Sequence, residues 1–307
     1  MQISVIMPCY CSSGTLERSV RSLQAQSFPD WELVAVDDGS PENDYELLCR
    51  LAKEDPRIRA FRQENGGVSS ARNRGIREAG GEWLFFLDAD DYLTEGAFER
   101  LLKNVSAEED IVCGAYEIRY RDSGEKIVST CSDGGLQTVM ESLIRGDSAL
   151  NSMCARLYRA SFIRQNSICA DTKLAIGEDV LFNLAAFLHA RAWKIQSDVV
   201  YIYDYGGNSA MVKARKDVYG KSLPMLFAIG CFLRENGLCT RFFRAHIDVW
   251  LRMLRADRGR FAAALEYGKL ASGEVIRDVQ PARLSTAKEK LYYWALRIFP
   301  FSSILLP

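Results

Sequence analysis

Three aspartates, Asp88, Asp90 and Asp91, directly follow the apolar run 83–87. Carboxylate oxygens are the ligands that Mg²⁺ and Mn²⁺ prefer, and these ions keep coordination positions open for water and phosphate oxygens. The Asp-x-Asp spacing therefore predicts a site where a divalent cation meets a phosphate group. A polar turn that caps the next helix is the alternative interpretation, because aspartate is common in turns.

The run that precedes the aspartates is typical of a buried strand. Trp83-Leu84-Phe85-Phe86-Leu87 is wholly apolar and follows a pair of glycines, the pattern of a parallel strand covered on both faces. Such a strand presents its carboxyl end to the crevice where open α/β sheets bind ligands. We therefore expect the aspartates to lie at a ligand-binding edge.

Two earlier apolar runs also end in residues that could bind a ligand. The run 3–7 stops at Pro8-Cys9-Tyr10, and the run 31–36 stops at Asp37-Asp38. Apolar residues at helical spacing follow each run, and a further short strand is expected over 58–61. Three strand-helix units before residue 90 predict an α/β fold, an αβα sandwich with a mostly parallel central sheet.

The second half of the chain shows a different pattern. Short strand-like runs at 110–118, 127–131 and 193–205 predict a less regular, mixed part of the sheet. Glu178 and Asp179 begin an almost wholly apolar helical segment. Acidic residues favour helix N-termini through the helix dipole alone, so the pattern leaves both a capping role and a catalytic role open.

Helical patterns without strands continue from about residue 217, and we expect a domain over 1–215 and a C-terminal helical region over 216–307. The final stretch 291–307 is aromatic and apolar, but Arg297 and Pro300 interrupt it, which argues against a membrane span. Contact with a membrane surface and packing on the core or in an oligomer, such as a homodimer, both stay open.

Composition excludes several classes of protein. The 307 residues carry a net charge of −1, which gives no electrostatic footprint for nucleic acid. Nine cysteines, an odd number without a Cys-x-x-Cys pair, and two histidines encode neither a disulfide framework nor a zinc site. With no signal peptide pattern at the N-terminus, a cytoplasmic location is expected, free or peripheral on the inner face of the membrane.

Five motifs together resemble the ordered motif series of family 2 glycosyltransferases, which are inverting enzymes with a GT-A fold. The motifs are Ser-Val-Ile-Met-Pro-Cys-Tyr at 4–10, Val-Asp-Asp-Gly-Ser at 36–40, Asn-Gly-Gly at 65–67 with Ala-Arg-Asn at 71–73, Leu-Asp-Ala-Asp-Asp at 87–91, and Gly-Glu-Asp at 177–179. The resemblance covers about residues 2–210. The family often has an aromatic-Arg or His-containing segment where this chain has 203–209.

The resemblance implies a nucleotide-binding set. Pro8 and Tyr10 line the nucleobase pocket, and Tyr10 stacks against the base. Asp38 accepts a hydrogen bond from the imide N–H of the base, which suits uracil. Arg72 and Asn65 lie near the nucleotide.

The resemblance also implies a metal and a catalytic base. Asp88 lies near the ribose and the metal, Asp90 binds the Mn²⁺ or Mg²⁺ that bridges the diphosphate, and Asp179 is the general base. A single base without a covalent nucleophile implies direct attack and inversion. The expected partners are a UDP-sugar donor and a glycan or lipid-linked glycan acceptor in cell-surface polysaccharide synthesis.

Two other classes of protein are alternatives to this hypothesis. A nucleotidyltransferase of similar fold usually carries a Gly-rich signature with a basic residue after the first strand, which residues 8–11 lack. A non-catalytic scaffold could keep the same fold. Intact carboxylates at 88, 90 and 179 argue against a scaffold.

Overall fold

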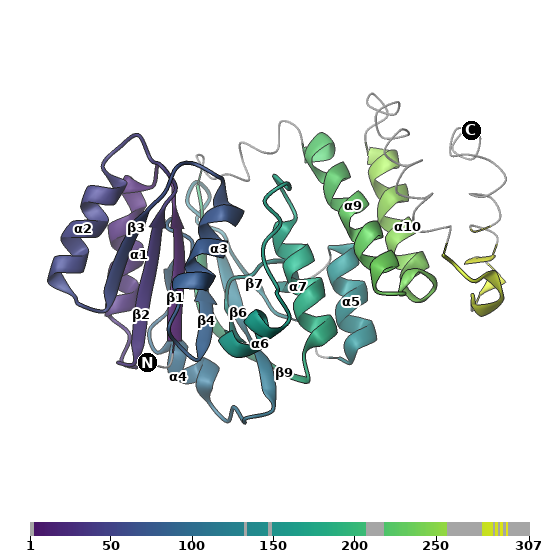
Figure 1. The fold of residues 1–307 in the computed structure, drawn as a ribbon, viewed down its shortest axis with the longest axis horizontal. Helices are drawn as coiled ribbons and strands as arrows, with labels where there is room; N and C mark the ends of the chain where they lie inside the picture. The colour runs from purple at the N-terminus through teal and green to yellow at the C-terminus, as the bar shows by residue number, and fades with distance from the viewer. Residues whose placement is uncertain are drawn as a thin grey trace. The chain divides into compact units, whose positions relative to one another are not determined.

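The structure is a computed structural model that describes residues 3–131, 134–146, 149–206, 218–256 and parts of 278–293. It forms two compact units (Figure 1). Unit 1 consists of Met1–Val139, Ser148–Lys173 and Glu178–Ser209, and unit 2 of Met140–Asp147, Leu174–Gly177 and Ala210–Pro307. The predicted boundary at residue 215 lies outside the described residues.

Four parallel strands build the first part of the sheet in unit 1. They run in the order β3-β2-β1-β4, with bounds β1 Ile3–Cys9, β2 Trp31–Asp37, β3 Ile58–Arg62 and β4 Trp83–Phe86. All side chains of β2 and β4 are buried, as expected for strands covered on both faces. The predicted strand-helix units are confirmed.

Three helices connect these strands: α1 Ser13–Gln24, α2 Asp44–Glu54 and α3 Val68–Glu78. The connections from β1 to β2 and from β2 to β3 move across the sheet in one direction, and the connection from β3 to β4 moves in the other. Because such crossovers are right-handed, α3 lies on the opposite face of the sheet from α1 and α2 (Figure 1). Helix α3 approaches β1 closely, because a Cβ atom on Gly75 would lie 2.3 Å from Cγ2 of Ile6.

The second part of the sheet is mixed, as the short strand-like runs predicted. Strand β8 Arg156–Arg159 pairs antiparallel with β4, and β6 Glu109–Tyr120 pairs antiparallel with β8. Strand β9 Ala192–Tyr205 runs parallel to β6, while β5 Tyr92–Leu93 and β7 Lys126–Ser129 pair antiparallel with β9 and β6. Strands β5 and β8 were not expected from the sequence.

Further helices follow in this part of the chain. They are α4 Ala97–Leu102, α5 Leu136–Arg145, the 3₁₀ helix η1 Ala149–Asn151, α6 Ala160–Gln165 and α7 Glu178–His189. Most of α5 belongs to unit 2. Helix α7 begins at the Glu178-Asp179 pair, where the sequence predicted a helix start. Gly177, with φ +88°, precedes it.

Unit 2 contains the helices α9 Val218–Glu235 and α10 Cys239–Ala256 and the 3₁₀ helix η4 Pro281–Arg283, which confirms the predicted helical C-terminal region. Within the described part of the chain, no helix is both long and apolar enough to cross a membrane. Of the segment 291–307 only Tyr293 is described, and its buried ring contacts Phe243. The other predictions for this segment lie outside the described residues.

Candidate active site

The carboxyl ends of β1, β2 and β4 lie side by side, because β1 pairs with both neighbours. The sheet therefore places three of the predicted motifs at one edge, as expected for parallel strands. Pro8 is half-buried near the end of β1, and Tyr10 just beyond it is 54% exposed. An aromatic face is thus available to a ligand at this edge.

Asp38 organises the loop that leads into α3. Its buried carboxylate accepts hydrogen bonds from the N–H groups of Gly66 (3.0 Å) and Gly67 (2.7 Å) and from Nε2 of Gln63 (2.7 Å). Its own N–H donates to the carbonyl of Cys9 at 2.8 Å. These contacts fix the carboxylate between β1 and the glycine loop. The predicted role of Asp38 in reading the base stays a prediction.

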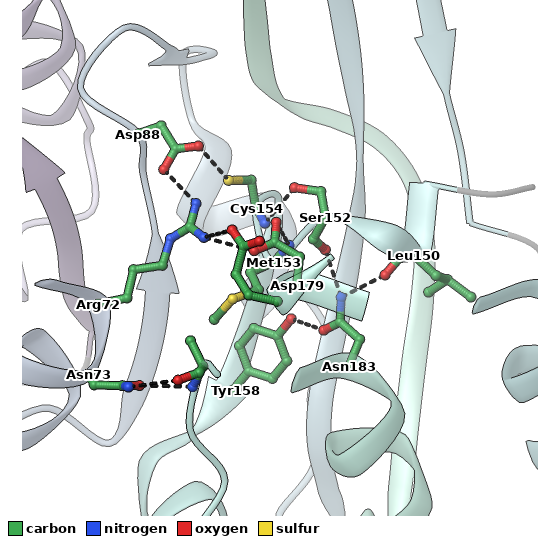
Figure 2. Close-up of polar contacts among 12 residues, drawn as sticks. Arg72, Asn73, Asp88, Leu150, Ser152, Met153, Cys154, Tyr158, Asp179 and Asn183 are labelled. Atoms are coloured by element: carbon green, nitrogen blue, oxygen red, sulfur yellow. Dashed lines mark hydrogen bonds and ion pairs between the residues drawn. The ribbon is translucent and has the colours of Figure 1, made fainter. Parts of the chain in front are cut away.

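Arg72 is the centre of a cluster of charges (Figure 2). Its side chain is only 5% exposed, and its Nη1 donates to Oδ1 of Asp179 at 2.7 Å and to Oε1 of Glu178 at 3.0 Å. Its Nη2 donates to Oδ1 of Asp88 at 3.0 Å. Burial alone lowers the pKa of the guanidinium, but the charges of the surrounding carboxylates, Asp179 first, raise it well above its ordinary value. Arg72 is therefore a permanent cation here.

The two acids at the start of α7 differ in their surroundings. Asp179 accepts a second hydrogen bond, from the N–H of Met153 at 3.3 Å, and its side chain keeps 21% exposure. Burial and then the charge of Asp179 raise the pKa of Glu178 to about 7, against the opposing effect of Arg72. The pair can therefore hold a proton near neutral pH, while Asp179 stays reachable from outside.

The three aspartates after β4 have separate environments. Asp91 is buried and accepts hydrogen bonds from the hydroxyl of Tyr201 at 2.6 Å and the N–H of Asp204 at 2.9 Å, so it holds β9 against this loop. Asp90 is half-buried, and burial followed by the charge of Asp88 raises its pKa to about 6. A bound cation would relieve the repulsion between Asp88 and Asp90.

The two carboxylates of Asp88 and Asp90 are the type of ligand that suits a divalent cation whose remaining ligands come from a substrate. Among the described residues, no three His, Cys, Asp or Glu side chains converge to hold a metal ion by themselves. Mg²⁺ commonly binds through one or two carboxylates and completes its shell with water and substrate phosphates. The predicted metal role of both aspartates stays a prediction.

Several residues of the site were not identified from the sequence. Arg18 on α1 and Arg121 after β6 form ion pairs with Asp204, and Arg18 also donates to the carbonyl of Asp90 at 2.6 Å. Cys154 brings its thiol within 3.7 Å of Oδ2 of Asp88. Arg18, Arg121 and Cys154 belong to no apolar run or motif, so the sequence carried no signal for them.

The α/β sandwich thus carries acidic and aromatic residues at one strand edge and an acidic pair at the start of a later helix. Residues 4–166 match the family profile "Glycosyl transferase family 2". The chain therefore belongs to glycosyltransferase family 2.

Relatives agree with this membership, and a solved structure shares the fold. The uncharacterized glycosyltransferase EpsJ of Bacillus subtilis is 33% identical over 67% of this chain, and the match spans 62% of EpsJ. TarP of Staphylococcus aureus, a poly(ribitol-phosphate) beta-N-acetylglucosaminyltransferase, is 28% identical over 65% of this chain and 62% of TarP. The crystal structure of S. aureus TarS 1-349 has a TM-score of 0.72 at 20% identity, covering 97% of this chain and 87% of that one. This likeness confirms the GT-A fold.

Proposed function

We propose that this glycosyltransferase moves a sugar from a UDP-sugar to a hydroxyl group of a cell-surface glycan acceptor, with inversion at the anomeric carbon. One observation carries the proposal. The guanidinium of Arg72 contacts Asp88, at the strand edge that fits the donor, and Asp179, the carboxylate suited to act as base. A donor end and an acceptor end thus share one small region of the molecule.

At the donor end, the leaving group is a nucleoside diphosphate whose negative charge grows as the glycosidic bond breaks. Asp90 and Asp88 would hold a divalent cation, which supplies charge neutralisation to the diphosphate when bound. The exposed ring of Tyr10 can stack on the base. Asp38 lies near Tyr10, because its N–H donates to the carbonyl of Cys9, and the glycine loop contacts the carboxylate of Asp38. Stacking on one face and a carboxylate that accepts from an imide N–H are a combination that suits uracil.

At the acceptor end, Asp179 would take the proton from the attacking hydroxyl. Two donors, Nη1 of Arg72 and the N–H of Met153, hold one carboxylate oxygen each. Each oxygen has a further lone pair, so the carboxylate can still accept a proton. With one base and no nucleophilic side chain assigned, the acceptor oxygen attacks the anomeric carbon directly, which inverts its configuration.

The choice of donor and acceptor class draws on the relatives. TarS has been solved in complex with UDP and with UDP-GlcNAc, and TarP is named for transfer to poly(ribitol-phosphate). We infer the same class of donor, a UDP-sugar, and an acceptor of the cell-surface glycan class, which includes lipid-linked glycans. The individual sugar depends on pocket shape rather than on the fold.

A donor screen tests the proposal. Thermal unfolding is measured with a panel of UDP-, GDP-, CDP- and dTDP-sugars, each with Mn²⁺ and with EDTA, because a bound ligand stabilises the folded state by mass action. The expected result is a shift for one or more UDP-sugars that needs Mn²⁺, followed by UDP release when a glycan acceptor is added. Stabilisation by no UDP-sugar, or UDP-sugar turnover that retains the anomeric configuration, would contradict the proposal.

A further inference from the structure

The segment 149–154 crosses the candidate active site and contributes backbone atoms to it. The N–H of Met153 donates to Oδ2 of Asp179, and the next residue, Cys154, places its thiol near Asp88 (Figure 2). The segment contains the 3₁₀ helix η1 and then an irregular stretch before β8. Two side chains outside the segment, Arg156 and Asn183, donate hydrogen bonds to its carbonyl groups.

Asn183 supplies two of these hydrogen bonds. Its fully buried amide donates from Nδ2 to the carbonyl of Leu150 at 2.6 Å and to the carbonyl of Ser152 at 3.0 Å. Its Oδ1 accepts from the hydroxyl of Tyr158 at 2.6 Å. Both amide hydrogens are therefore used on the segment, and Tyr158 fixes which end of the amide faces it (Figure 2).

The contacts with Ser152 and with Asp179 are made by one peptide group. The carbonyl of Ser152 and the N–H of Met153 belong to the same planar peptide group, so they point in opposite directions. Asn183 binds the carbonyl side and Asp179 accepts from the N–H side. A rotation of this peptide would turn a carbonyl oxygen towards the carboxylate of Asp179, which is repulsive.

We propose that Asn183 is a positioning residue for Asp179. It lies four residues later on α7, hence on the same face of the helix, and it acts through the peptide between Ser152 and Met153. That peptide holds the carboxylate of Asp179 at its second oxygen, while Arg72 holds the first. The inference rests on the proposed role of Asp179 as the base.

Replacement of Asn183 by serine or alanine tests the proposal on the intact chain. Serine keeps one hydroxyl donor and is the variant more compatible with folding. We expect kcat with the donor found in the screen to fall about tenfold or more, since small misplacements of a catalytic group are costly. The dissociation constant for UDP with Mn²⁺ should stay within about twofold, because Asn183 has no contact with the donor edge.

Ser4→Ala provides the matched control. Ser4 is also fully buried, and its hydroxyl donates to Glu32 at 2.6 Å, but it lies near the start of β1, away from the carboxyl end. This variant should lose stability and keep kcat. Unchanged kcat in both Asn183 variants, or a loss of UDP binding that parallels the loss of kcat, would overturn the positioning role.

A double-variant cycle separates this proposal from the assignment of the base. If Asn183 acts through Asp179, then Asn183→Ser should have no further effect on single-turnover transfer in the Asp179→Asn background. Multiplied losses would overturn the positioning role and leave the base assignment intact. Near wild-type transfer by Asp179→Asn alone would overturn the base assignment, and the positioning role with it.

Discussion

Nη1 of Arg72 lies 2.7 Å from Oδ1 of Asp179, and this ion pair joins helix α3 to the start of helix α7, 107 residues later in the chain. Arg72 is one buried cation that faces three carboxylates, with Asp88 and Glu178 as the other two. Burial, followed by the charge of Asp179, raises the pKa of Glu178 to about 7, and Arg72 only partly opposes this. Arg72, which orients the proposed base Asp179, therefore also contacts Asp88 at the donor edge.

We predict that Arg72→Lys lowers transfer strongly. A single ammonium cannot reproduce the planar fork that reaches Asp88 from one nitrogen and Asp179 from another. We expect kcat to fall about a hundredfold. The free energy of unfolding should fall by about 1–3 kcal/mol as one carboxylate loses its buried partner.

Urea unfolding and steady-state kinetics check this prediction. Arg77→Lys, on the exposed side of the same helix, is the matched control and should change neither quantity. Equal activities of Arg72→Lys and the wild type would show that any cation at this position is sufficient.

The pKa of Glu178 predicts a pH-dependent stability. Its folded-state pKa of about 7 lies above its ordinary value of 4.5, so the folded protein binds this proton more tightly than the unfolded chain. The contribution of Glu178 to stability therefore declines as pH rises from about 4.5 to about 7. Glu178→Gln removes the ionisation, and the variant should gain about 1–3 kcal/mol on the wild type across that interval.

Chemical denaturation at a series of pH values measures the difference. Glu46→Gln, an exposed glutamate on α2, should show a difference that is flat with pH. A flat difference for Glu178→Gln as well would mean that Glu178 ionises normally in the folded protein.

The sequence correctly predicted which residues lie at the carboxyl ends of β1, β2 and β4. Each apolar run and the polar residues that follow it are adjacent in the sequence, so a local pattern is sufficient. It did not reveal strand β8. Four residues with arginine at both ends, Arg156 to Arg159, form no apolar run, yet β8 lies between β4 and β6. Arg156 is buried because it donates to the carbonyls of Ala149 and Leu150.

Contacts between segments that are distant in the sequence could not be predicted either. The sequence places Arg72 and the Glu178-Asp179 pair in separate motifs, and only the folded chain brings them within hydrogen-bonding distance. In the sequence, Asn183 is a single polar residue within a predicted apolar helix, and nothing indicates its partners. Its three hydrogen bonds depend on β8 and the segment before it, neither of which the hydrophobic pattern predicted.

Metal removal should weaken donor binding through Asp90. We predict that Asp90→Asn binds UDP in Mn²⁺ no better than the wild type does in EDTA, because an amide is a poorer cation ligand than a carboxylate. A proton competes with the cation for Asp90, whose pKa is about 6, so the Mn²⁺ effect on the wild type should decline below about pH 6. Calorimetric titration measures both, with Asp122→Asn in the exposed turn after β6 as control. Unaltered Mn²⁺-dependent binding by Asp90→Asn would remove Asp90 from the metal site.

Asp38 should discriminate between bases. Its carboxylate is fixed by Gln63, Gly66 and Gly67, so it cannot turn away from an unsuitable ligand. Uracil presents an N–H where cytosine presents an acceptor, and an acceptor facing a carboxylate is left unpaired. The wild type should therefore bind UDP at least about tenfold more tightly than CDP. Equal affinities in competition titrations would exclude base reading by Asp38.

The replacement Asp179→Asn should separate donor binding from transfer. Asparagine keeps the size of the side chain, and its oxygen can still accept from Arg72 or from the N–H of Met153. The amide cannot take a proton from the acceptor, so transfer should fall by about 10²-fold to 10⁴-fold, the usual effect of losing a general base. UDP affinity should stay near that of the wild type, since Asp179 meets the donor edge only through Arg72.

Asp198→Asn, on the exposed part of β9, is the control. If UDP binding disappeared together with transfer, Asp179 would belong to the nucleotide site, and the proton would have to be taken by another carboxylate, of which Glu178 is the nearest on the helix.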